Sequence, residues 1–93
     1  MRALTWDDFA GAVGSAYVVA VGEAQIELTL EHAAEIDSAV RTGGSFRLDF
    51  LGPCDPVLSQ ATYPLRRGEE VLEIFIVPVG RDSEGTRYEA IFN

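Results

Sequence analysis

The stretch EIFIVPVG, Glu73–Gly80, decides how this chain has to be built. Successive side chains of a β-strand point to opposite faces, so its two isoleucines would face one way and Phe75, Val77 and Val79 the other. Both faces of this strand are therefore apolar, whereas most other strand-like segments alternate between apolar and polar residues. The first question is what covers the second face.

The chain beyond Gly14 has a period of two, which is typical of strands. Pro64 has no N–H to donate, so we expect its strand to lie at an edge or to be bulged there. The connections are too short for the crossovers that parallel pairing requires. We therefore predict a mainly β fold, a small antiparallel six-stranded barrel or two-layer sandwich with one short N-terminal helix. No internal repeat is evident. The predicted strands are Ala16–Val21, Gln25–His32, Ser45–Gly52, Ala61–Arg67, Val71–Val79 and Thr86–Asn93.

The helix is predicted in LTWDDFAGAVG, Leu4–Gly14. Thr5 is a suitable N-cap residue, and Asp8 three residues later resembles the acidic member of a capping box. A helix of about two turns is marginal alone, so its apolar side must pack on something. That side is a stripe at helical spacing, made of Trp6, Phe9, Ala10 and Val13.

Two predicted strands are apolar on both faces, Ala16–Val21 and Val71–Val79. The helix would bury its stripe economically by lying over the outer face of this pair, because each large side chain so buried contributes about 1.5–3 kcal/mol. The alternative explanation is that a partner subunit covers the same face. The two are compatible, since two turns of helix are too short to cover two long strands.

Three connections stand out. The segment RDSEG, Arg81–Gly85, predicts a hairpin loop with a positive φ at Gly85. Ile36–Gly44 predicts a loop or a short turn of helix. The most distinctive loop is Pro53–Gln60, which two prolines stiffen and in which Asp55 before a proline favours a turn. It is either a rigid recognition loop or a structural crossover between the halves of the barrel.

Length and charge exclude several classes of protein. Ninety-three residues predict one domain, 1–93. The net charge is -8, and the seven cations are all arginine, which argues against nucleic acid and anionic lipid as partners. No segment has the roughly 20 apolar residues that a membrane span needs, so we expect no membrane insertion. The single cysteine and the lack of a signal-peptide pattern predict a cytoplasmic protein.

The sequence predicts no catalytic, cofactor-binding or metal-binding residue. His32 is the only histidine and has no cysteine close to it, so it matches no recognisable metal site. Cys54 would need a base to act as a nucleophile, and only His32 could supply one, by chance of folding. The carboxylates are scattered on outward strand positions, where solvation accounts for them.

Three segments, FRLDFLGPCDPVLSQATYPLRR, LEIFIVPVG and RYEAIFN, resemble an uncharacterised family of small bacterial β-rich domains. The likeness extends over nearly the whole chain. The family has no assigned activity, and its genes often lie near those of phage-tail-collar-like proteins. The resemblance therefore implies an accessory or structural role in a tail-like or surface assembly. The pattern GP…QxTY…VPVG…YEAxFN is carried here by Gly52 and Pro53, Gln60–Tyr63, Val77–Gly80 and Tyr88–Asn93.

We therefore expect a non-enzymatic protein-interaction or structural accessory module that forms a homo-oligomer or joins a larger assembly, without a cofactor. The alternative is a small-ligand carrier whose barrel interior is lined by Tyr17, Tyr63, Tyr88 and Phe92. An enzyme that uses Asp55, His32 or Cys54 is the third hypothesis. The residues expected to make the protein contacts are Phe75, Val77, Val79, Pro53, Asp55, Pro56 and Gln60.

Overall fold

The computed structural model describes residues 4–36 and 45–92. Within these ranges the chain forms a short helix and six strands, mainly β and antiparallel as predicted. Of the predicted Ile36–Gly44 loop, all but Ile36 lies outside the described residues. The elements are α1 (Asp7–Ala10), β1 (Ala16–Val21), β2 (Ala24–Ile36), β3 (Ser45–Gly52), β4 (Ala61–Arg67), β5 (Glu70–Asp82) and β6 (Gly85–Phe92).

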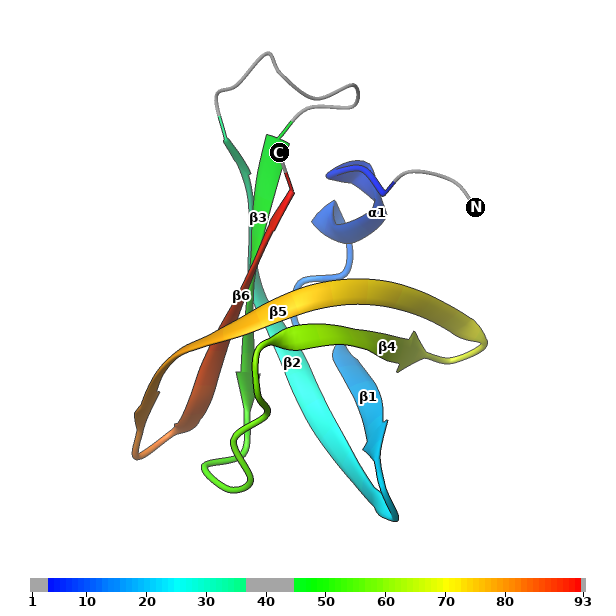
Figure 1. Cartoon of the computed structure of the whole chain (residues 1–93). Helices are drawn as coiled ribbons and strands as arrows, with labels where there is room; N and C mark the ends of the chain where they lie inside the picture. The colour runs from blue at the N-terminus through cyan, green and yellow to red at the C-terminus, as the bar shows by residue number, and fades with distance from the viewer. Residues whose placement is uncertain (1–3, 37–44, 93) are drawn as a thin grey trace.

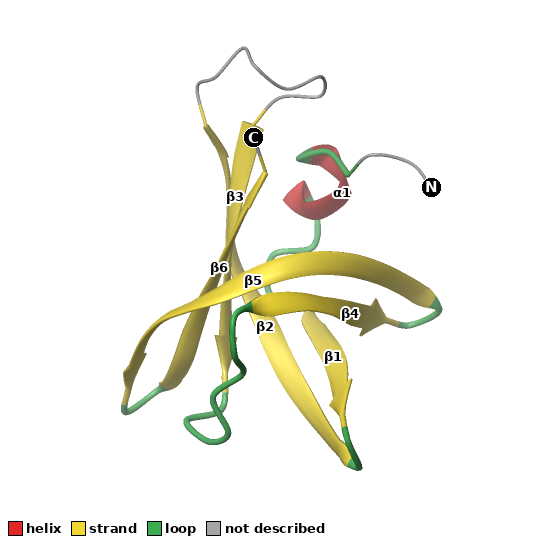
Figure 2. Cartoon of the chain, in the orientation of Figure 1, coloured by secondary structure: helices red, strands yellow, loops and turns green. Residues whose placement is uncertain are grey.

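The described strands close into one ring, so of the two predicted architectures the barrel is correct. The order around the ring is β1-β2-β3-β6-β5-β4, and every neighbouring pair is antiparallel. Figure 1 shows the long strand β5 crossing the front of the ring with the long strand β2 behind it, and Figure 2 shows that α1 lies beside the ring rather than within the sheet.

The two longest strands make the closure possible, because each pairs with a different neighbour along either half. β2 pairs with β1 over Ala24–Thr29 and with β3 over Thr29–Ile36. β5 pairs with β4 over Glu70–Ile76 and with β6 over Val77–Asp82. The β2–β3 ladder shifts register near residue 31 of β2, and the β5–β6 ladder shifts near residue 79 of β5. Such bulges bend a strand and increase its twist, which carries the sheet around a corner.

The barrel consists of two similar halves, although the sequence shows no evident internal repeat. In each half a short strand, a two-residue turn, a 13-residue strand and an 8-residue strand follow one another. Both turns begin with a glycine at positive φ, Gly22 at 61° and Gly68 at 63°. Apart from these and a few other positions the residues differ, so the repeat is visible in the structure first. The identical matches are Tyr17 and Tyr63, Gly22 and Gly68, Glu23 and Glu69, Glu27 and Glu73, and Arg47 and Arg87.

The interior of the ring answers half of the question that β5 raises. Ile74 and Ile76 are fully buried inside the barrel, as their positions in the strand predict. Phe75 remains 49% exposed and Val79 57% exposed on the outside. The interior is filled mainly by large side chains, among them Tyr17, Leu28, Leu30, Phe46, Leu48, Phe50, Leu65 and Tyr88.

The helix is shorter than predicted. It spans Asp7–Ala10, and its N-cap position is Trp6 rather than Thr5. Half of the expected capping box is present, because the Thr5 N–H donates to a carboxylate oxygen of Asp8 at 2.7 Å. The helix ends before Val13, which is 49% exposed, so the predicted stripe does not bury its last member.

The position predicted for the helix over the outer face of β1 and β5 is wrong. Phe9 is completely buried, and its ring lies 5.8 Å from Phe46 and 6.2 Å from Phe92 between centroids. The Trp6 indole N–H donates to the Ala33 carbonyl at 3.3 Å, which holds α1 near β2. The physical reason is that β4 separates β1 from β5 in the ring, while aromatic rings at the ends of β3 and β6 need a cover.

Replacing Phe9 with alanine is expected to lower the free energy of unfolding by about 3–5 kcal/mol, because it removes a fully buried ring and leaves a cavity. Replacing Val13 with alanine, at the exposed end of the same segment, is the matched control and is expected to change it by less than about 0.5 kcal/mol. Urea denaturation followed by circular dichroism measures both. Equal effects of the two changes would contradict the placement of α1.

The Gly85→Ala variant is expected to be destabilised by about 2 kcal/mol or more, because two constraints meet at this glycine. Its φ is 146°, and a Cβ there would collide with the carbonyl oxygen of Gly52 on the paired strand β3. Gly80→Ala is the control, since nothing lies within 4 Å of the Cβ it would add. Thermal unfolding of the two variants is compared, and a Gly85→Ala protein as stable as Gly80→Ala would refute this expectation.

Candidate interaction surface

The outer face of the barrel carries an apolar region where β1, β4 and β5 lie side by side. The registers place Val18 of β1 opposite Arg66 of β4, and Arg66 opposite Val71 of β5. The β1–β4 ladder contains only this one pair. The prediction that this strand lies at an edge or is bulged at Pro64 is wrong, because β4 is part of a closed ring and its register with β5 continues through Pro64 without a shift. The one-pair ladder with β1 leaves room for a residue that has no N–H to donate.

A groove of about 180 Å³ opens at this seam. We call it the Arg66 groove, and its lining is almost entirely apolar apart from the guanidinium group. Arg66 is exposed, and no ion pair or hydrogen bond of its side chain is found within the described part of the chain. The groove is lined by Val18, Ala20, Pro64, Arg66 and Val71.

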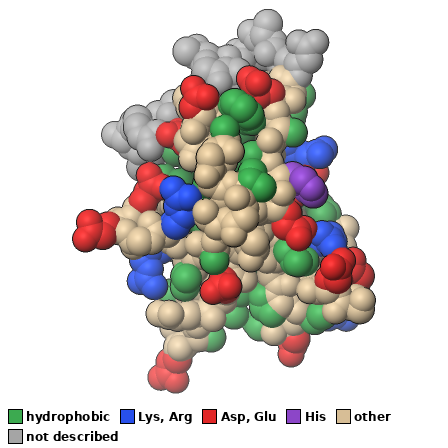
Figure 3. All heavy atoms as spheres, turned by 180° about the vertical axis from the view of Figure 1, so that it is seen from behind, with side chains coloured by type: hydrophobic (Ala, Val, Ile, Leu, Met, Phe, Trp, Pro, Cys, Tyr) green, Lys and Arg blue, Asp and Glu red, His purple; other side chains and the backbone are tan. Residues whose placement is uncertain are grey.

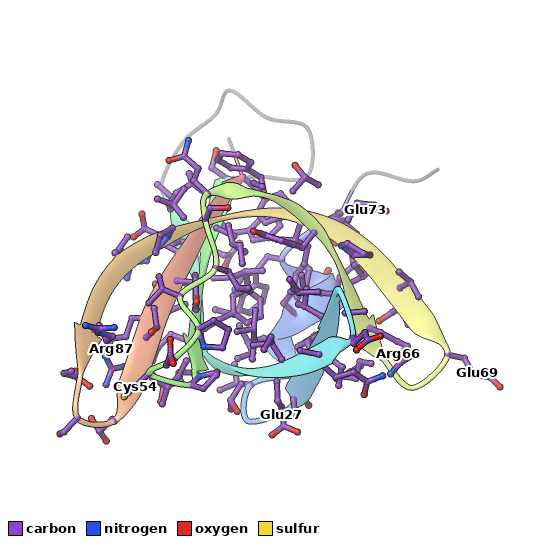
Figure 4. The ribbon with its side chains drawn as sticks, turned by 60° about the horizontal axis from the view of Figure 1, so that its bottom comes forward. Glu27, Cys54, Arg66, Glu69, Glu73 and Arg87 are labelled. Atoms are coloured by element: carbon purple, nitrogen blue, oxygen red, sulfur yellow. The ribbon has the colours of Figure 1, made fainter. Side chains whose placement is uncertain are left out.

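Pro64 and the two strands that are apolar on both faces stand out in the sequence, but the sequence did not predict that these groove residues come together. Val18 and Ala20 are two residues apart in β1, and so are Pro64 and Arg66 in β4, which indicates that each pair shares a face. Whether the two pairs lie close together depends on the register of strands that are distant in sequence. Val71 is 54% exposed at the start of β5, and Glu73 follows it on the same face, opposite Pro64. Figure 4 shows Arg66, Glu69 and Glu73 on one side of the barrel.

The three residues of β5 that the sequence predicted as contacts are not equivalent. Phe75 is exposed and lies opposite Thr62, one outward position beyond Glu73. Val79 is exposed at the register shift. Val77 is half-buried and lies opposite Glu89 of β6. Phe75 is therefore the member that extends the apolar surface of the Arg66 groove.

The predicted recognition loop lies mostly elsewhere. Pro53, Asp55, Pro56 and Gln60 are exposed, and the Asp55–Pro56 peptide bond is cis. Gln60 directly precedes the residue that pairs with Ile76, so it lies beside the outer face of β5. The rest of the loop lies near the β5–β6 hairpin, and Figure 4 shows Cys54 on the side of the barrel away from Arg66. The structure thus joins Gln60, but not the two prolines, to the β5 surface.

Buried contacts hold this loop in place. Leu58 is buried, and its backbone N–H donates to the Tyr88 hydroxyl at 2.8 Å inside the barrel. The Cys54 carbonyl accepts hydrogen bonds from Arg81 at 3.4 Å and Thr86 at 3.5 Å. Leu58 was missed by the sequence analysis, because one leucine in a polar loop carries no periodic signal. These contacts favour a structural part for the loop alongside any recognition.

His32 and Cys54, which the enzyme hypothesis would use, contact different strands of the barrel. His32 is exposed, with its Nδ1 3.7 Å from Asp49 on the neighbouring strand. Cys54 is exposed, and its thiol donates to the Asp82 carbonyl at 3.3 Å in the β5–β6 hairpin. Among residues 4–36 and 45–92, no three His, Cys, Asp or Glu residues are placed to hold a metal ion. Figure 3 shows acidic side chains spread over the face seen from behind.

The densest set of charges surrounds Arg87 of β6. Its guanidinium contacts Glu31 at 2.6 Å, Glu84 at 3.0 Å and Asp82 at 3.4 Å. The Glu84 backbone N–H also donates to Asp82 at 2.8 Å. That hydrogen bond, followed by the contact with Arg87, lowers the pKa of the Asp82 carboxyl. The cluster ties β2 to the β5–β6 hairpin and so acts as a structural clamp.

The aromatic residues proposed to line a ligand cavity each contact other residues of the chain. Phe92 stacks on Phe46 at 4.4 Å, and the Tyr63 hydroxyl donates to the Ser59 carbonyl at 2.8 Å. Tyr17 is fully buried, packs edge-on against Phe50, and its hydroxyl has no hydrogen-bond partner among the described residues. Burial raises the pKa of this phenol.

These features define a small closed β-barrel domain with a filled interior and an uncovered apolar region on its outer face. The chain belongs to the family described as Domain of unknown function (DUF6916), whose model matches residues 4–92. This agrees with the predicted resemblance to an uncharacterised small domain. Comparisons with curated proteins and with solved structures find no match. No helix among the described residues is long and apolar enough to cross a membrane.

The Asp82→Asn variant is expected to be less stable than the wild type at pH 7. A lowered carboxyl pKa contributes stability above the ordinary value of 3.8, and this contribution is lost as the pH falls through the folded-state pKa. The difference should therefore shrink as the pH falls below 3.8 and vanish below the folded-state pKa. Urea denaturation across this range measures it, with Asp55→Asn as a control in the exposed loop. A difference that persists unchanged in acid would contradict the proposed clamp.

Proposed function

We propose that this domain is a non-enzymatic protein-interaction or structural accessory module. The observation that carries the proposal is the uncovered apolar region formed by the Arg66 groove and Phe75. Soluble proteins rarely leave contiguous apolar patches exposed, and larger ones rimmed by polar residues mark interaction sites. Here the rim carries Glu27, which lies opposite Val18 of β1, and Glu73, which lies opposite Pro64 of β4.

The amount of burial available supports this function. Val71 and Phe75 are about half exposed, and neither is covered by α1, which is committed to the end of the barrel. Fully burying a large apolar side chain contributes about 1.5–3 kcal/mol, so a few such residues can supply the central anchors of an interface. Gln60, which is exposed and directly precedes the residue paired with Ile76, adds a polar group able to bind a partner's backbone.

The finer proposal is an accessory role in a phage-tail-like or surface assembly, as a cytoplasmic homo-oligomer or assembly subunit. Its support is the gene context of the family that the chain resembles. A closed ring leaves few free strand edges, so an assembly contact through side chains on the outer face suits this domain better than strand addition.

The alternative, a small-ligand carrier, has weaker support. The interior residues proposed for it fill the barrel, and the Tyr88 hydroxyl already accepts the Leu58 N–H. The Tyr17 hydroxyl, which has no partner within the described residues, is the one observation in its favour. An enzymatic function has no geometric support comparable to that of the apolar surface.

Replacing Phe75 with serine is expected to weaken protein association at least about tenfold, because it removes the largest exposed apolar side chain of this region. The wild type is tested by light scattering alone and after co-expression with products of neighbouring genes. Val13→Ser is the matched control, since Val13 and Phe75 are both 49% exposed but only Phe75 lies on the proposed surface.

Neither substitution is expected to shift the thermal unfolding midpoint appreciably, because both side chains are half solvated. The proposal fails if the wild type remains monomeric and binds none of these products. It fails equally if Phe75→Ser associates as strongly as Val13→Ser.

A further inference from the structure

We propose that the partner of the Arg66 groove is a second copy of this chain, in a two-fold dimer that pairs Arg66 of each copy with Glu73 of the other. The inference rests on the proposed function, since it names the occupant of the same surface. The observations that carry it are the arrangement of four side chains on β4 and β5, and the charges that they leave without partners.

The four side chains form a square on the outer face. Arg66 lies opposite Val71, and Pro64 lies opposite Glu73, on two adjacent outward positions of the paired strands. The two apolar residues therefore occupy one diagonal and the two charged residues the other. Diagonal neighbours on adjacent strands are roughly 7–8 Å apart between Cα atoms, so the square is compact.

Two-fold symmetry makes this square complementary to itself. In a face-to-face dimer the axis lies in the plane of the interface, and each residue meets the residue on the other side of that axis. An axis along the Pro64–Val71 diagonal brings Pro64 onto Pro64 and Val71 onto Val71. It brings Arg66 onto Glu73 of the second copy, and the reverse, as an isologous interface requires.

The charges favour this occupant over a basic protein. The side chains of Arg47, Arg67, Arg81 and Arg87 all have partners within the chain. Arg66 is the exception among the described arginines, and it lines an apolar groove where a carboxylate of a partner could reach it. A cationic partner would face Arg66 with like charge, whereas a second copy supplies Glu73, which is exposed and makes no ion pair within the described residues.

The apolar surface around the square extends the contact. Val18 and Ala20 lie on one flank of the groove, and Phe75 lies on the other, beyond Glu73. These side chains supply the area removed from water, while the two reciprocal ion pairs fix the register. This division matches the general finding that interface charges determine specificity more than affinity.

Exchange of charges tests the proposal. The wild type is expected to sediment at twice the chain mass of 10.1 kDa. Arg66→Glu alone and Glu73→Arg alone should each be monomeric, because each places like charges opposite one another twice. An equimolar mixture of the two variants should restore the dimer, since both contacts then become attractive. The doubly substituted protein should also dimerise.

Glu27→Arg is the matched control. Glu27 flanks Arg66 in the same row across the sheet, with Val18 between them, and the substitution changes the charge by the same amount. Mixed with Arg66→Glu, it should restore no dimer. Circular dichroism of each variant shows whether it is folded, and the restored mixture shows this independently.

A wild type that is monomeric at all concentrations tested overturns the dimer. So does a dimer that survives both single substitutions, or one that Glu27→Arg rescues as well as Glu73→Arg. If the monomer still binds a different protein through Phe75, only this inference falls and the proposed function stands. If it binds nothing, both fall.

Discussion

The structure depends on two 13-residue strands, β2 and β5, each of which pairs with two neighbouring strands. Each strand pairs with one partner along its first half and another along its second, with a register shift near the change. The ring can close only because of this bend. Once it closes, inward side chains such as Ile74 and Ile76 join a core cluster that contains residues of every described strand and Phe9 of α1.

Closure decides where the remaining apolar groups go. Phe9 packs against the aromatic rings at the ends of β3 and β6, and Leu58 anchors the loop on another side of the barrel. Both are therefore used to complete the interior. The apolar outward residues of β1, β4 and β5 receive no cover from the described chain, and it is this surplus, rather than any reactive group, that points to association with protein.

Much of the fold followed from the period-two pattern. The strands Ala16–Val21, Ser45–Gly52 and Ala61–Arg67 lie where the pattern places them, and Gly85 has the positive φ expected of its turn. The helix was misplaced because a stripe shows which side of a helix is apolar but not which surface receives it. The Arg66 groove and the two similar halves could not be predicted, since both depend on which distant strands become neighbours.

The central claim is that α1 completes the interior and leaves the outer face of β5 uncovered. Nuclear Overhauser contacts from the Phe9 ring test it most directly, in a sample dilute enough to contain one copy per particle. The account predicts strong contacts with Phe46 and Phe92, whose ring centroids lie 5.8 and 6.2 Å away, and none with Phe75 or Val71. Contacts from Phe9 to Phe75 or Val71 would place the helix on the outer face and contradict the account.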